Sequence, residues 1–417
     1  MKKTLAAVAV LGAFAGSALA ADVTLYGKVD LGLNYTHTDV DGVSSDNWGM
    51  KSGQNSGSRF GIKGTEQISD GLTVGFQLEN GFDADDGRFK YGNDDGERMF
   101  GREARLFVQT DFGELGFGRM GGLDSGSGSY DIFGGKAGVF GTGWSGIGSD
   151  SAIFLGMSSR YDNMITYKSP TFGGVTVYAQ ASLKQDSSKD GDEASSKADR
   201  YYALGATGTW GALSTGVVAS MYDYGHANHY TGDLAYDGET GEVTQTIKEV
   251  TTDDDGYAVG AFVAYDFNVT KVTLGAQYFD GVQQSRGDSE FTISATPGFD
   301  EDGNFSIENS SGKLTYGSES AGAKGYGVML GAVTPLGSGS LYTSIGYRDS
   351  ENADENYGGQ LDETVYQVAV GYTYPLSKRT YLYTAAGYTQ EELDKGGNTD
   401  TVKTKTTEVV AGIVHNF

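Results

Sequence analysis

The sequence predicts an all-β protein: a transmembrane, antiparallel, up-and-down β-barrel of about sixteen strands whose third long loop folds inward. Three observations support this fold class. Apolar and polar residues alternate with period two in one segment after another, and short and long connections alternate between those segments. The chain also holds 66 glycines and 27 tyrosines but only 4 prolines, a composition typical of long paired strands with bends.

The first residues predict a secretory signal peptide over 1–20. Lys2 and Lys3 precede an apolar run over 5–15, and Ala18 and Ala20 form a small-residue cleavage site. We therefore expect a barrel domain over 21–417, and loss of the two lysines would take the formal net charge from −25 to about −27. That acidity argues against a nucleic-acid partner. The chain has no cysteine, which excludes disulfides, thiol chemistry and cysteine-based zinc sites.

The segment 22–35 predicts the first strand. Val23, Leu25 and Val29 share one face, whereas Lys28 and Asp30 share the other. Alternation over about fourteen residues is longer than an ordinary strand needs. It fits a tilted strand with hydrocarbon on one side and water on the other.

The same pattern predicts the remaining strands. They are expected over 58–68, 72–82, 98–110, 113–120, 160–169, 173–184, 199–210, 213–224, 256–267, 269–281, 325–336, 339–350, 364–376, 379–390 and 406–417.

The connections between these segments alternate between two kinds. Short ones lie at 69–71, 111–112 and 210–211 and at Pro170, Phe267, Pro335 and Pro375; long polar ones lie at 38–57, 83–97, 121–159, 185–198, 225–255, 282–324, 351–363 and 391–405. Consecutive hairpins produce this pattern when one end of a barrel has tight turns and the other has long loops. An open strand edge cannot face hydrocarbon, so the sheet must close, and about sixteen strands enclose an aqueous channel. The alternative, a soluble sandwich or barrel, would need an apolar core where the sequence offers polar residues at every second position.

The long connection at 121–159 is the predicted constriction loop. It is rich in glycine and shows neither helix nor strand periodicity, and loops of this length are usually functional. We expect it to fold into the lumen and narrow it, with Asp124, Asp131, Lys136 and Asp150 among its charged residues.

Several local strings resemble the general diffusion porins of Gram-negative outer membranes. They are Asp-Val-Thr-Leu-Tyr-Gly at 22–27, the segment 58–66, Arg-Leu-Phe-Val at 105–108, the segments 112–119 and 160–170, and the final Phe417. The resemblance implies a homotrimeric outer-membrane barrel, in contact with lipid and lipopolysaccharide, that passes ions and small hydrophilic solutes by passive diffusion. It also implies that Phe417 is part of the signal read by the outer-membrane assembly machinery.

The resemblance places positive charges on the channel wall. It matches Arg59, Lys63, Arg105 and Arg160 to wall positions, and Lys168 shares the parity of Arg160. Alternation independently turns the first three inward, and an arginine facing lipid would cost ~2–4 kcal/mol at the midplane.

The constriction loop departs from the family pattern at one position. The family often has a Pro-Glu-Phe-Gly-Gly-like motif, but this chain has Asp-Ile-Phe-Gly-Gly at 131–135, with apolar Ile132 at the glutamate position. Asp124 and Asp131 are therefore the expected acidic residues of the constriction, and Lys136 adds a positive charge.

Arg119 has the outward parity of Leu115 and Phe117. The resemblance implies a contact between this arginine and acid from the second loop of a neighbouring subunit, for which Asp83 and Asp85 are candidates. The alternative is an arginine whose charged end reaches toward water at the strand end.

No motif supports catalysis, a metal or a cofactor. Gly141 to Gly146 match the spacing G-x-G-x-x-G, but neither a preceding βαβ unit nor a following helix is expected. His226 and His229 with Asp223 would form at most a weak metal clip.

We therefore expect a channel for passive diffusion, with mild cation preference that declines as salt screens the charge of the loops. The inward arginines argue for the opposite preference. The alternatives are a substrate-selective channel with a binding track, or a surface adhesin or structural barrel that acts through its long loops.

Overall fold

A computed structural model describes residues 23–90, 98–157, 160–187, 192–195, 198–224, 228–236, 243–251, 255–282, 291–299, 305–314, 322–353, 362–394 and 401–417. The expected signal peptide lies outside these residues. Within them, no helix has the length and apolar character that a membrane crossing requires.

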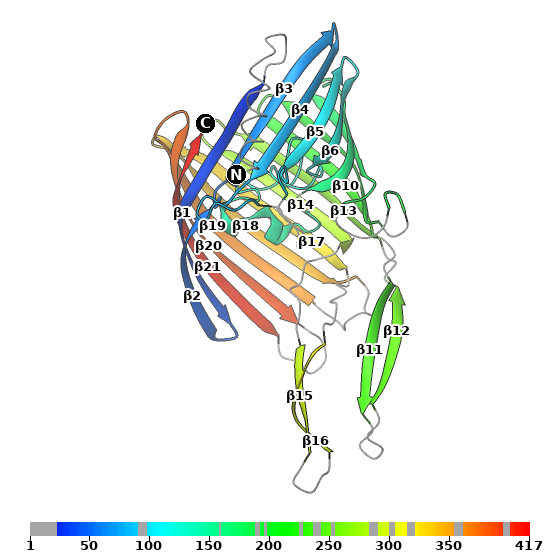
Figure 1. Ribbon diagram of the computed structural model, residues 1–417. Helices are drawn as coiled ribbons and strands as arrows, with labels where there is room; N and C mark the ends of the chain where they lie inside the picture. The colour runs from blue at the N-terminus through cyan, green and yellow to red at the C-terminus, as the bar shows by residue number, and fades with distance from the viewer. Residues whose placement is uncertain are drawn as a thin grey trace, which may run out of the picture.

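The chain forms a closed antiparallel barrel of 16 strands, which confirms the predicted fold class (Figure 1). The wall strands are β1 (Thr24–Val40), β3 (Arg59–Ser69), β4 (Leu72–Gly81), β5 (Glu103–Thr110), β6 (Gly113–Met120), β7 (Tyr161–Lys168), β8 (Val175–Ser182), β9 (Arg200–Trp210), β10 (Leu213–Asp223), β13 (Gly256–Asp266), β14 (Lys271–Val282), β17 (Ala323–Leu336), β18 (Gly339–Asn352), β19 (Asp362–Pro375), β20 (Thr380–Asp394) and β21 (Val402–Asn416). Strand β1 pairs with β21 from Lys28 opposite Asn416 to Val40 opposite Thr404, and this pairing closes the wall.

Several boundaries differ from the sequence prediction. The expected loop 38–57 contains an additional strand, β2 (Val43–Ser52), which forms a hairpin with an extended β1. Its two-residue turn places Asp41 and Gly42 at φ values of 49° and 86°, the conformation of the tight turns that match strand twist. The expected strand at 98–110 begins only at Glu103.

Two expected long loops also contain hairpins. β11 (Asn228–Tyr236) pairs with β12 (Val243–Thr251), and β15 (Phe291–Phe299) pairs with β16 (Phe305–Leu314), each as a separate two-stranded sheet. At the opposite end of the barrel, Pro335 and Pro375 lie within the last residues of β17 and β19, so the tight turns begin just after them.

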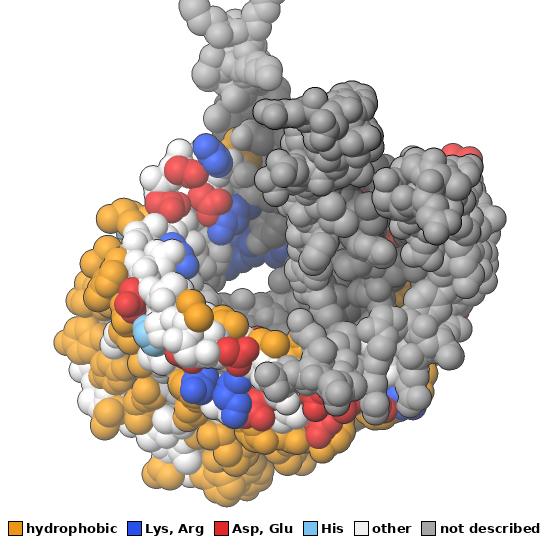
Figure 2. Space-filling model, turned by 90° about the horizontal axis from the view of Figure 1, so that it is seen from below, with side chains coloured by type: hydrophobic (Ala, Val, Ile, Leu, Met, Phe, Trp, Pro, Cys, Tyr) orange, Lys and Arg blue, Asp and Glu red, His pale blue; other side chains and the backbone are white. Residues whose placement is uncertain are grey.

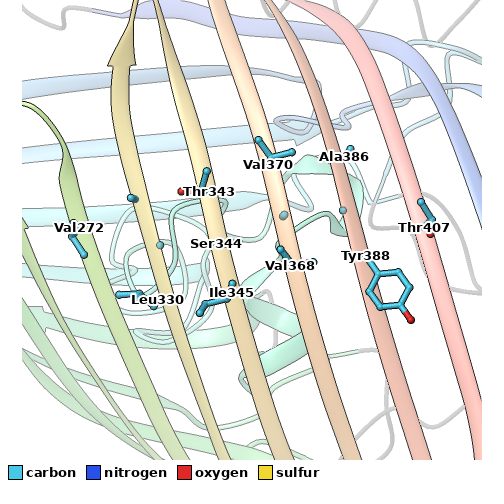
Figure 3. A pocket seen from close by; sticks show the side chains of 14 residues that line it. Val272, Leu330, Thr343, Ser344, Ile345, Val368, Val370, Ala386, Tyr388 and Thr407 are labelled. Carbon is cyan, nitrogen blue, oxygen red and sulfur yellow. The ribbon is translucent and has the colours of Figure 1, made fainter.

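The outer face of the wall is apolar. Along β17, Val328 and Leu330 are exposed while Met329 between them is buried, as alternation requires. A shallow apolar hollow of about 720 Å³ on this face is bordered by Leu330, Ile345 and Val368 (Figure 3). Figure 2 shows apolar side chains covering the outside of the described wall. This surface is suited to hydrocarbon.

Exposed aromatic residues gather toward both ends of the outer wall. Tyr278, Tyr326 and Tyr366 lie toward the long loops, whereas Phe112 and Phe267 lie at the tight turns. Such aromatic girdles mark the two membrane interfaces of a transmembrane barrel.

The largest buried apolar clusters lie where the loop at 121–159 meets the inner wall. The loop contains a 3-10 turn, η1 (Trp144–Gly146), and one helical turn, α2 (Asp150–Ile153), which is visible inside the barrel in Figure 1. It therefore occupies the lumen, as the sequence predicts.

Candidate functional site: the constriction of the lumen

The third loop follows the inner wall along a row of glycines. A Cβ built at Gly260 would lie 2.7 Å from the ring of Phe133, and one at Gly275 would lie 2.6 Å from the backbone oxygen of Ala137. The same close approach occurs at Gly205, Gly331, Gly346, Gly371 and Gly387, which meet Ile132, Val139, Ile153, Phe140 and Ile147 respectively. Any larger residue at these inward positions would push the loop away from the wall. Part of the high glycine content is thus explained by the fit of this loop.

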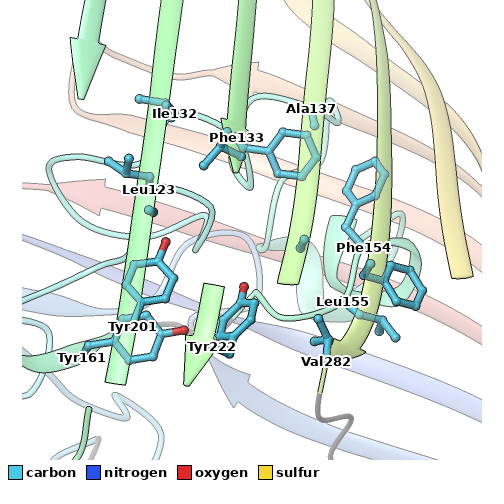
Figure 4. Close-up of a cluster of buried hydrophobic side chains, with 14 of the residues drawn as sticks. Leu123, Ile132, Phe133, Ala137, Phe154, Leu155, Tyr161, Tyr201, Tyr222 and Val282 are labelled. Carbon is cyan, nitrogen blue, oxygen red and sulfur yellow. The ribbon is translucent and has the colours of Figure 1, made fainter. Parts of the chain in front are cut away.

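Apolar side chains of the loop fill the contact with the wall (Figure 4). Phe133 packs on Phe154 with ring centroids 5.1 Å apart, and Leu155 is anchored because the Gln277 side chain bonds to both its N–H and its C=O. Burial of these side chains stabilises the loop in its inward position.

Asp124 lies inside the loop rather than on its pore-facing surface. It is 1 % exposed, and the hydroxyls of Tyr201, Ser220 and Tyr222 donate to its carboxylate at 2.8, 2.5 and 2.9 Å. Burial raises the pKa of Asp124, although the three hydroxyl bonds oppose that rise. The expectation that Asp124 lines the constriction is therefore corrected: it fastens the loop to β9 and β10.

Asp131 and Asp150 also serve the loop backbone. Asp131 accepts hydrogen bonds from the N–H groups of Gly126, Phe133 and Gly135, and Asp150 accepts one from Gly138. Burial raises the pKa of both carboxyls. Asp131 is thus not the exposed acid that the sequence suggested, because its oxygens are used within the loop. Lys136, by contrast, is exposed.

Arg105 is enclosed between wall and loop. It lies 2.9 Å from Glu103 and 3.3 Å from Glu114, and it donates to the Tyr130 hydroxyl of the loop at 2.9 Å. Its side chain is only 9 % exposed. Strand alternation correctly predicted that Arg105 points inward. Its charge is compensated by Glu103 and Glu114, and its hydrogen bond to Tyr130 holds the loop against the wall.

The loop touches the wall at a second place. A Cβ built at Gly143 would lie 2.3 Å from the backbone oxygen of Asn55, which follows β2. Between this contact and the one at Arg105, the wall carries Lys28, Arg59 and Arg102. The guanidinium of Arg102 is 2.6 Å from Glu79. Lys28 and Arg59 are half-buried, whereas the Arg102 side chain is only 8 % exposed.

Ser56 is the point where two of these cations meet. Lys28 Nζ and Arg59 Nη2 each donate to Ser56 Oγ at 3.0 Å. Seen from the long-loop end, the molecule has a central opening with Lys and Arg side chains beside it (Figure 2).

Asp30 fixes the backbone that presents Ser56. Its buried carboxylate accepts the N–H groups of Asn55 and Ser56 at 2.7 Å and the Tyr383 hydroxyl at 2.7 Å. Lys28 and Asp30 both lie on the polar face of the first expected strand, so the alternation pattern already indicated that both point inward. The sequence prediction missed Arg102 because it extended the strand over 98–110, and alternation over that range assigns Arg102 to the outward face. Strand β5 begins only at Glu103.

The remaining expected wall residues are spread along the lumen. Lys63 lies over the ring of Tyr26, with Nζ 5.2 Å from the centroid. Lys168 ends β7 opposite Glu114, and Arg160 is buried at the start of that strand. The roles of Arg160 and Lys168 in conduction stay predictions.

Arg119 has an acid partner within its own chain. Its Nη1 is 2.6 Å from Asp162, and its Nε donates to the Gly101 carbonyl. The acid expected from a neighbouring subunit is thus supplied internally. Asp83 pairs with Lys90 in the second loop at 2.7 Å, and Asp85 is exposed. A role for these residues between subunits stays a prediction.

The C-terminal residue completes the wall. The backbones of Phe417 and Gly27 exchange two hydrogen bonds, of 3.0 and 3.1 Å, and a Cβ built at Gly27 would lie 2.4 Å from the Phe417 ring. Phe417 thus covers the start of β1 on the closing seam.

Among the described residues, no group of three or more His, Asp or Glu is arranged to hold a metal ion. His226 of the suggested metal clip lies outside the described residues, and only the backbone of His229 is described.

Comparison with known proteins identifies the family. The family model of Gram-negative porins matches residues 6–394. An outer membrane porin protein of Bordetella pertussis is 33% identical over the full length of both chains. The solved anion-selective porin from Comamonas acidovorans has a TM-score of 0.57 at 23% identity, covering 95% of this chain and 100% of its own. The trimer form of OmpT from Vibrio cholerae has a TM-score of 0.54 at 14% identity, with coverage of 95% and 100%. The chain therefore belongs to the Gram-negative porin family and forms an outer-membrane channel for passive diffusion.

Proposed function

We propose that this porin is a homotrimer whose constriction admits ions and small hydrophilic solutes and prefers anions. The observation that carries this proposal is the pairing of charges beside the opening. Among the described residues, Glu79 lies against Arg102, and Glu103 and Glu114 lie against Arg105.

The positive side chains that keep some exposure are the ones we expect passing anions to meet. Arg59 is 22 % exposed, and it shares Glu79 with Arg102, at 3.9 Å and 2.6 Å respectively. Lys63 and Lys136 are exposed, and Lys28 is half-buried. In a narrow channel with low-dielectric walls, the nearest charges dominate the field that an ion feels.

This proposal departs from the mild cation preference that the net charge of −25 suggests. Charges more than about 8 Å from the ion path are largely screened at physiological ionic strength. The acids expected at the constriction, Asp124 and Asp131, are used inside the loop. The structurally similar porin from Comamonas acidovorans is anion-selective, which supports the same direction.

The homotrimer and the membrane partners belong to the same proposal. A trimer form is known for OmpT, a structural neighbour, and the apolar wall with its aromatic girdles suits outer-membrane lipid and lipopolysaccharide. Phe417 at the closing seam is the candidate signal for the assembly machinery.

Reversal potentials across a planar bilayer with a tenfold KCl gradient test the selectivity. We expect the sign of an anion-preferring pore, with the preference declining as total salt rises. A cation-preferring potential would contradict the proposal. Liposome swelling with sugars of graded size would report the size limit, and swelling by monosaccharides is the expected result.

A further inference from the structure

A cavity of about 600 Å³ lies in the lumen between the third loop and the tight turns. It is lined by aromatic residues on one side and by polar residues on the other. The lining used below is Asn55, Ser56, Trp144, Tyr342, Lys378 and Tyr381. Its volume lies in the range of small-molecule sites.

The aromatic side of the cavity is built from both loop and wall. Trp144 of the loop packs on Tyr342 of β18 with ring centroids 5.3 Å apart, and it meets Tyr383 of β20 edge-on at 5.9 Å. Phe140 and Tyr383 are almost fully buried and serve to pack the loop. Tyr342 and Tyr381 are only half-buried, so their rings remain accessible from the cavity.

The loop backbone at Trp144 is strained. Trp144 and Ser145 both have left-handed φ values, 61° and 59°, which residues with a Cβ rarely adopt. Such conformations persist where surrounding packing enforces them, and they concentrate at functional sites. Here the strain accompanies an indole ring placed on the cavity wall.

The polar side of the cavity includes Ser56, which is bonded to two cations that do not themselves line the cavity. Ser56 Oγ is held by Lys28 and Arg59 at 3.0 Å each, and Asp30 fixes the backbone N–H of Ser56. Tyr381 donates to Asn55 Oδ1 at 2.7 Å, which links the polar side to the aromatic side. Lys378 adds a further cation at the tight turns.

We infer that this cavity transiently binds small carboxylates that carry a flat ring. The ring stacks on Tyr342 and Tyr381, and the carboxylate takes charge-assisted hydrogen bonds at the Ser56 corner from Lys28 and Arg59. This inference rests on the proposed function, because it names a solute class for the same channel. A solute held here would pause on the turn side of the constriction.

The test uses single-channel recording of the whole porin in KCl, with solutes added from the turn side. Benzoate should interrupt the current in a concentration-dependent manner. Cyclohexanecarboxylate has the same charge without a planar ring, acetate has the charge alone, and glucose has a ring without charge. We expect each of these three to block at least fivefold more weakly than benzoate.

Substitutions locate the site. Tyr342→Leu should weaken the benzoate block at least fivefold. Tyr381→Phe keeps the ring and loses only the bond to Asn55, so its block should stay within twofold of the original. The matched control is Tyr366→Leu, which removes an outward ring that is 47 % exposed and should change nothing. If Tyr342→Leu fails to assemble, two other variants take its place. Tyr342→Phe should change the benzoate block by less than twofold, and Ser56→Ala should weaken it by more than threefold.

The outcomes separate this inference from the proposed selectivity. Equal block by benzoate, cyclohexanecarboxylate and acetate in an anion-preferring pore would overturn the inference and leave the selectivity intact. Block by glucose as strong as by benzoate would also overturn it, since charge would play no part. Strong benzoate block in a cation-preferring pore would support the cavity and contradict the selectivity.

Discussion

Replacing Arg59 with serine should weaken the anion preference of the channel about fourfold. At about 5 Å from the guanidinium in a water-like dielectric, a monovalent anion gains roughly 0.8 kcal/mol. Screening at 0.1 M salt leaves about 0.5 kcal/mol of that energy, which corresponds to about a twofold excess of anions. Cations are depleted by the same factor, so the ratio of anion to cation permeability changes by about fourfold. Focusing of the field by the low-dielectric walls would enlarge the effect.

The assay is the reversal potential of Arg59→Ser in the same salt gradient. Its matched control is Arg88→Ser, which removes the same charge from the second long loop, where the Arg88 side chain is 79 % exposed. The control should shift the permeability ratio by less than a third of the Arg59 effect. Equal shifts in the two variants would show that net charge, rather than the charge beside the opening, selects the ions, and the reasoning would be refuted.

Three further predictions concern the attachment of the third loop. Arg105→Ala leaves two largely buried carboxylates without their arginine, a change that typically costs about 3–5 kcal/mol; we expect noisier current and faster proteolysis of the loop, and a quiet, protease-resistant channel would count against the anchoring role. Gly275→Val places side-chain atoms where Ala137 now lies, so the loop should move into the lumen and single-channel conductance should fall; unchanged conductance would mean that the loop adapts without moving inward. Burial raises the pKa of Asp124, so the attached loop binds a proton more tightly than a detached loop, and attachment should strengthen as the pH falls from neutral toward about 4. Brief closures should therefore become rarer between pH 8 and pH 5, and Asp124→Asn, which resembles the protonated acid, should reduce this dependence; an identical pH response in the variant would exclude Asp124 as its source.

The wall of the barrel was predictable because its physical rule is local. A strand between hydrocarbon and water must alternate, and that rule turns Val328 and Leu330 outward and Arg59 and Lys63 inward without any knowledge of their partners. Length and hydrogen bonding then require the sheet to close. Strand β2 escaped prediction because its residues Val43 to Ser52 are polar enough to resemble a loop.

The roles of individual charged residues in the third loop could not be predicted from alternation. The length of this loop, its glycine content and its place after the fifth predicted segment indicate a constriction, yet nothing local distinguishes an acid that faces the pore from one that fastens the loop. Asp124 became an anchor because Tyr201, Ser220 and Tyr222, which lie about eighty to one hundred positions later, bring their hydroxyls to it. The inward arginines show the same limit, since Arg105 has its charge compensated by Glu103 and Glu114, whereas Arg59 shares its acid with Arg102.

The amino-acid sequence alone was sufficient for the membrane barrel, its inward and outward faces and the loop that enters the lumen, because alternation and segment length act on neighbouring residues. The folded chain was needed to establish which charges remain available to solutes and where aromatic rings meet positive charge. Those properties depend on pairs of residues brought together from distant strands, and the free energy of a charge depends on the partners and burial that the fold gives it.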